Sequence, residues 1–97
     1  MVNWGDKLDR LTINFIKKSK KSGETPSPTR LLFLIEELCN LNLALWTLED
    51  EIRSGIPDEQ AGKIGKEIAR VNDKRAKTKN KINKLLGSNE REEKIYS

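Results

Sequence analysis

Leucine and isoleucine recur every seven residues through the middle of the chain. One row begins at Leu31, and a second row begins three positions later at Leu34. The two rows consist of Leu31, Leu38, Leu45 and Ile52 and of Leu34, Leu41 and Leu48. This spacing aligns the side chains along one seam of an α-helix that packs against another helix, as in coiled coils. Ser27 followed by Pro28 is a common helix start, so the pattern predicts a helix over about residues 28–54.

A break at Gly55 and Pro57 separates this helix from a second long helix. Beyond the break, positions spaced three and four apart are small or apolar, apart from one arginine. These positions are Ala61, Ile64, Ile68, Val71, Arg75, Thr78, Ile82 and Leu85. The spacing predicts a helix over about residues 57–86, which Gly87 ends. Two long helices joined by so short a turn must lie antiparallel.

The N-terminal part of the chain contains a shorter amphipathic pattern. Its apolar positions are Leu8, Leu11, Phe15 and Ile16. They predict a short helix over about residues 6–18, followed by a basic linker over 19–27. Residues 88–97 are expected to form a flexible tail. We therefore interpret residues 1–97 as one all-α domain, a long antiparallel helical hairpin of coiled-coil type with a short N-terminal helix.

The first long helix has more apolar residues than one seam requires. We define its outer row as Leu32, Cys39, Leu43 and Trp46, beside which stands Phe33. Because one partner helix cannot cover both the seam and the outer row, we expect a homodimer with a four-helix core. The four residues of the outer row are the candidate interaction residues, and another protein is a further candidate partner. In the alternative, the N-terminal helix folds back over part of the row within one chain.

Arg75 falls on the apolar seam of the second long helix, where an unpaired guanidinium would be costly. With Ile56 as the mirror point of the hairpin, Glu37 lies across from Arg75. The favoured interpretation is a structural Glu37–Arg75 ion pair that fixes the register of the two helices. The alternative is an arginine that binds a ligand.

Basic residues give the chain a net charge of +4 and raise the alternative of nucleic-acid binding. The candidate residues are Lys17, Lys18, Lys20, Lys21, Lys66, Arg70, Lys74, Lys77 and Lys81. However, residues 31–57 contain five acidic residues and one basic residue, and they can balance much of the charge of residues 58–87. Stacking aromatic residues are also absent from the basic stretches. Solvated helix faces are therefore favoured over a binding groove.

The residue types that most catalytic sites need are missing. The 97 residues include no histidine and one cysteine, Cys39. A zinc or other transition-metal site, a Ser-His or Cys-His pair and a disulfide within the chain are thereby excluded. No glycine-rich phosphate-binding motif occurs either. We predict that the protein is not an enzyme and has no catalytic, cofactor-binding or metal-binding residues, and hence no cofactor.

The sequence predicts a cytoplasmic location. The lone cysteine suits a reducing compartment, and the first residues do not resemble a signal peptide. The apolar stretch from Leu31 to Leu48 contains Glu36, Glu37 and Asn40, which would be costly in hydrocarbon. We therefore expect a buried helix and no membrane insertion.

Three blocks of sequence resemble a known family. They are Asp6-Lys7-Leu8 with Leu11-Thr12-Ile13; Leu45-Trp46-Thr47-Leu48-Glu49-Asp50-Glu51-Ile52-Arg53; and Asn72-Asp73-Lys74-Arg75-Ala76. In this order they resemble an uncharacterised family of short helical bacterial and phage proteins, some of which accompany glycosyltransferase or surface-polysaccharide genes. The resemblance implies a link to polysaccharide metabolism. Together with the patterning, it leads us to expect a non-enzymatic oligomeric interaction or scaffold protein.

Overall fold

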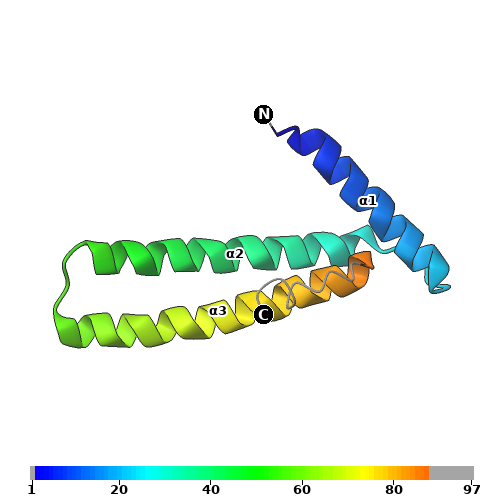
Figure 1. Ribbon diagram of the computed structural model, residues 1–97. Helices are drawn as coiled ribbons and strands as arrows, with labels where there is room; N and C mark the ends of the chain where they lie inside the picture. The colour runs from blue at the N-terminus through cyan, green and yellow to red at the C-terminus, as the bar shows by residue number, and fades with distance from the viewer. Residues whose placement is uncertain (1, 88–97) are drawn as a thin grey trace, which may run out of the picture.

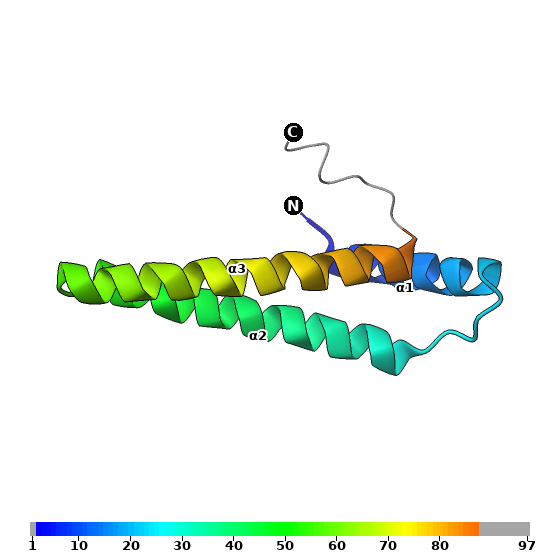
Figure 2. The ribbon, with the colours of Figure 1, turned by 90° about the horizontal axis from the view of Figure 1, so that it is seen from below.

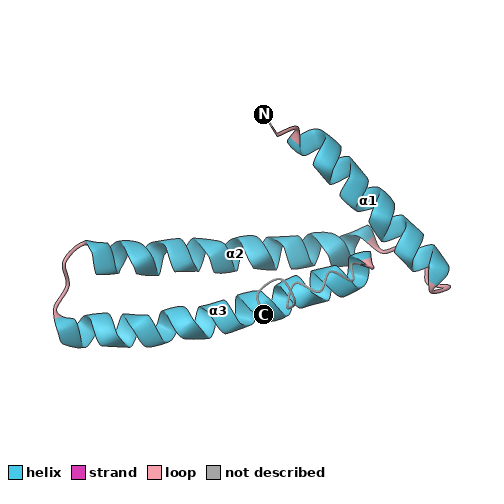
Figure 3. Ribbon diagram, viewed as in Figure 1, coloured by secondary structure: helices cyan, strands magenta, loops and turns pink. Residues whose placement is uncertain are grey.

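The computed structural model describes residues 2–87, and its ordered elements are three α-helices. They are α1 (Trp4–Lys21), α2 (Pro28–Arg53) and α3 (Asp58–Leu86), and no strand occurs among the described residues (Figures 1 and 3). The all-α fold is therefore confirmed. The flexible tail expected for residues 88–97 lies outside the described residues.

Helices α2 and α3 lie side by side and antiparallel, as both views of the ribbon show (Figures 1 and 2). They are about 39 and 43 Å long at 1.5 Å per residue. The turn between them, residues 54–57, contains Gly55 in the left-handed conformation with a φ of 87°. This confirms the predicted helical hairpin. Pro28 begins α2, and Ser27 stands at its N-cap position with an extended backbone, although the Ser27 side chain makes no capping hydrogen bond.

The core of the hairpin is a narrow seam between α2 and α3. Its most buried residues are Leu31, Leu34, Leu45, Ile64, Val71 and Thr78. All six belong to the rows that the heptad spacing predicts. The last residue of the α2 rows, Ile52, is exposed because α2 ends one residue later. A seam one helix wide buries little surface, so the isolated hairpin is expected to be only marginally stable.

Helix α1 packs on the open end of the hairpin and then projects away from it (Figure 1). It approaches α3, where Phe15 and Ser19 are buried, and it makes no close backbone approach to α2. The alternative in which the N-terminal helix covers the outer row is therefore wrong. Helix α1 extends beyond the expected 6–18 at both ends. At its start, the Asn3 side chain accepts a hydrogen bond from the Asp6 N–H at 3.0 Å and caps an earlier first turn. At its end, it includes the first three residues of the predicted linker 19–27, where Ser19 is buried.

Candidate interaction surface

The outer row of α2 is exposed along its whole length. Leu32, Leu43 and Trp46 expose 63%, 63% and 66% of their surface, and Cys39 is also exposed. Consecutive residues of a helix are about 100° apart, so the row that starts at Leu32 lies about 200° from the buried row that starts at Leu34. The outer row therefore faces away from α3. Since α1 does not approach α2, the described residues leave the row uncovered.

The exposed apolar area of the outer row and Phe33 is larger than that of a single exposed apolar residue. A fully buried aromatic side chain removes about 150–250 Å² from water, so Trp46 and Phe33, each about two-thirds exposed, offer about 100–160 Å² apiece. With two leucines and Cys39 the apolar surface is on the order of 400 Å². Apolar patches of this size on soluble proteins often mark a contact site.

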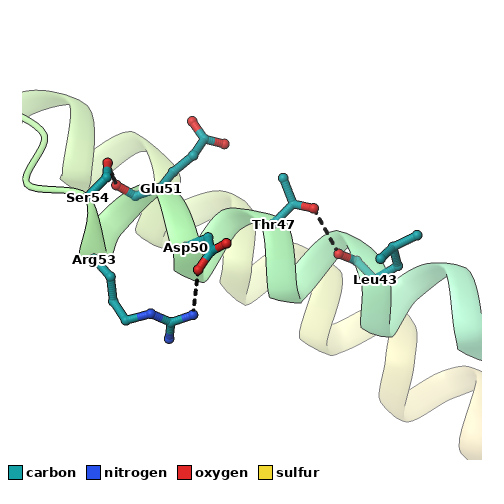
Figure 4. Close-up of polar contacts among 6 residues, drawn as sticks. All are labelled: Leu43, Thr47, Asp50, Glu51, Arg53 and Ser54. Atoms are coloured by element: carbon teal, nitrogen blue, oxygen red, sulfur yellow. Dashed lines mark hydrogen bonds and ion pairs between the residues drawn. The ribbon is translucent and has the colours of Figure 1, made fainter.

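Polar groups next to the outer row are bonded within α2 itself (Figure 4). The Thr47 hydroxyl donates to the Leu43 carbonyl at 3.1 Å, and the Arg53 guanidinium pairs with the Asp50 carboxylate at 2.8 Å. The Ser54 hydroxyl donates to a backbone carbonyl at 2.6 Å. These bonds hold the polar side chains along their own helix.

The predicted Glu37–Arg75 ion pair is wrong in its partners. The Arg75 Nε donates to the Asn42 Oδ1 at 2.7 Å, and Glu37 accepts from the Thr78 hydroxyl at 2.7 Å. In the described part of the chain, ion pairs form only within α2 and within α3. Polar bonds therefore still join α2 and α3, but each predicted partner bonds to a different residue.

The physical reason for this error lies in the direction of helical side chains. A side chain on an α-helix leans toward the N-terminus of its own helix. In an antiparallel pair the two sets of side chains lean in opposite directions. The α3 residue that contacts a given α2 residue therefore lies further along the chain than a mirror through the Cα atoms implies. The two observed bonds place the effective mirror point near Asp58 and not at Ile56.

The candidate nucleic-acid residues form two separate sets. Five of them lie exposed on one face of α3, namely Lys66, Arg70, Lys74, Lys77 and Lys81. Of these, Arg70 pairs with Glu67 at 3.2 Å. The other four, Lys17, Lys18, Lys20 and Lys21, line a groove between α1 and the C-terminal end of α3. The structure thus brings the basic end of α1 beside α3, which the sequence did not predict.

Helix α2 also has the length and composition of a membrane span, with a mean hydropathy of 1.5 over its most apolar window, of which the fold buries only 17%. The expectation that this stretch is a buried helix is therefore wrong. The contacts of α2 oppose placement across a membrane. Glu37 and Asn42 are bonded to α3, a helix with nine basic residues, and α3 would have to follow α2 into hydrocarbon at high cost. The absence of membrane insertion stays a prediction.

Across residues 2–87, no three side chains of the His, Cys, Asp and Glu types gather as a metal ion would need. No protein-family model, curated protein or solved structure matches the chain. The functional conclusion therefore rests on the outer row and on the charges of the helices.

Proposed function

We propose that this chain is a non-enzymatic helical interaction protein that self-associates through the outer row of α2 and serves as a small scaffold. The observation that carries this proposal is the exposure of Leu32, Leu43 and Trp46 on the side of α2 opposite the seam. Neither α1 nor α3 covers that side among the described residues. A second copy of the chain supplies a matching apolar surface, because the contact of a symmetric dimer uses the same patch on both subunits.

The outer row and Phe33 together offer a substantial apolar contact. If both are buried in two copies, on the order of 800 Å² of apolar surface is removed from water. Polar residues beside the row enlarge the total contact toward the roughly 1,200 Å² at which stable interfaces begin.

The dimer would also relieve the weakness of the isolated hairpin. Packing two α2 helices through their outer rows places the four helices in a row, α3–α2–α2–α3, because the outer row faces away from α3. The new seam between the two α2 helices encloses α2 on both of its apolar sides. The link to polysaccharide metabolism depends on the sequence resemblance alone and stays a prediction.

Nucleic-acid binding is the second candidate function, and the exposed basic face of α3 favours it. The four aromatic residues within the described part of the chain all lie on α1 and α2, so stacking on bases has no support along α3. Fluorescence anisotropy with duplex and single-stranded DNA and RNA at two salt concentrations tests this function. Submicromolar, steeply salt-dependent binding would favour it over the scaffold.

Light scattering tests the proposed self-association. At tens of micromolar, the wild type is expected to have a mass near twice the 11.1 kDa of one chain. The substitution Trp46→Glu places a charge in the outer row and is expected to give a folded monomer. The matched control, Trp4→Glu, makes the same change on α1 and should leave the dimer intact. A monomeric wild type, or a Trp46→Glu variant that is folded and still dimeric, would refute the proposal.

A further inference from the structure

Helix α1 carries a second apolar surface, and only part of it is used in the fold. Its apolar side runs through Trp4, Leu8, Leu11 and Phe15, at spacings of four, three and four residues. Phe15 is 3% exposed against the hairpin, whereas Trp4 and Leu8 are 73% and 56% exposed. The inner end of the stripe therefore fixes α1 to the hairpin, while the outer end points into solvent beyond the hairpin (Figure 1).

The charge of α1 differs from that of the outer row. Within Trp4–Lys21 there are six basic and two acidic residues. All six basic residues line the groove between α1 and the end of α3, which includes one carboxylate, that of Asp6. They are Lys7, Arg10, Lys17, Lys18, Lys20 and Lys21. The groove is therefore strongly basic and suited to anionic groups.

The basic groove and the exposed apolar end of α1 are neighbours. Lys7 lines the groove, and its ammonium lies 5.9 Å from the centroid of the Trp4 ring. A ligand that fills the groove with anionic groups can thus meet an indole and a leucine at the same place. This combination is typical of amphipathic helices that lie in the headgroup region of a membrane, where cations meet phosphates and aromatic rings enter the acyl boundary.

We propose that α1 is an interfacial anchor that binds the surface of an anionic lipid bilayer. Its cations bind the lipid phosphates and carboxylates, and Trp4 and Leu8 enter the boundary between headgroups and acyl chains. Because α1 projects from the hairpin, its outer half lies clear of α2 and α3 (Figure 1). A nucleic acid would use the cations but would leave Leu8 without a role. This site is separate from the outer row, so either proposal can fail while the other holds.

The two tryptophans report on the two sites separately. In the full chain with Trp46→Phe, Trp4 is the sole indole, and in the chain with Trp4→Phe, Trp46 is the sole indole. With vesicles of phosphatidylcholine and phosphatidylserine, the emission of Trp4 is expected to shift to the blue and saturate. Vesicles of phosphatidylcholine alone should produce no shift, and Trp46 should not respond to either vesicle. A response from Trp46 but not from Trp4, or equal binding to both vesicles, would overturn the proposal.

Charge variants with a matched control test the role of the groove. Each cation near an anionic surface strengthens binding by about fivefold. Lys7 and Arg10 are the groove cations in the outer half of α1, so Lys7→Gln with Arg10→Gln is expected to weaken vesicle co-sedimentation by about 25-fold. The control pair, Lys66→Gln with Lys74→Gln, removes the same charge from the exposed face of α3 and should weaken it less than about twofold. Equal losses in the two pairs would overturn the assignment to α1. So would duplex DNA that binds as tightly as the vesicles and depends on Lys7 and Arg10 in the same way.

Discussion

Replacing Thr78 with valine should destabilise the hairpin by about 2 kcal/mol. Thr78 is 1% exposed, and its hydroxyl donates to the Glu37 carboxylate across the helix pair at 2.7 Å. Valine has nearly the same shape, so the substitution opens no cavity and removes only the donor. A hydrogen bond to a charged group contributes about 1.5–3 kcal/mol. Because Glu37 is only half-buried, water can partly replace the donor, and we expect a loss in the lower half of that range.

Urea unfolding followed by circular dichroism measures this loss, with all variants at one protein concentration. The control is Thr47→Val, because the Thr47 hydroxyl is exposed and bonds within its own helix, and the expected change is below about 0.5 kcal/mol. Removing both partners with Thr78→Val and Glu37→Leu should restore most of the stability, since no polar group is then left without its partner. A Thr78→Val variant as stable as the wild type, or equal losses at Thr78 and Thr47, would refute the reasoning.

Two further predictions concern the contacts that hold α1 on the hairpin, namely the burial of Phe15 and the approach of Lys18 to Gly87. Phe15→Ala removes the buried side chain that holds α1 on the hairpin, a change that typically costs about 3–5 kcal/mol. Hydrogen exchange in α1 should therefore accelerate while α2 and α3 stay protected. Uniform acceleration in all three helices would contradict this prediction. Gly87→Ala and Gly55→Ala should each cost about 1 kcal/mol because both glycines have a positive φ. The loss should be larger at Gly87, because a Cβ there would lie 3.0 Å from the Lys18 side chain, whereas a Cβ at Gly55 would have no atom within 4 Å. Equal melting temperatures of the two variants would show that the contact with Lys18 is unimportant.

The hairpin could be predicted because it depends on a local pattern. A seven-residue repeat determines which side of α2 is apolar, and the break at Gly55 and Pro57 determines where the chain reverses. The observed bounds of α2 and α3 lie within one residue of those predicted. The start of α1 was missed although Asn3 is a good helix cap, because the apolar pattern alone begins later.

The packing of α1 could not be predicted from the same pattern. An apolar stripe indicates that one side of a helix is covered, but it does not identify the partner. Charge alone would direct the basic α1 to the acidic α2, and yet α1 contacts the basic α3. Burial of Phe15 outweighs the repulsion between surface charges, which water and salt screen. The outer row could therefore be predicted as apolar, but its exposure required the structure.

Cross-linking through Cys39 tests the proposed interface most directly. Cys39 is the one cysteine of the chain, it is exposed, and it stands midway between Leu32 and Trp46. A symmetric contact centred on the outer row places the two copies of Cys39 against each other, within the short Cα–Cα distance that a disulfide requires. Mild oxidation of the wild type should therefore give a covalent dimer on a non-reducing gel. The control variant, Cys39→Ser with Ala69→Cys, moves the thiol to the exposed face of α3 and should stay a monomer. Absence of the link at Cys39, or equal linking from position 69, would contradict an interface on the outer row.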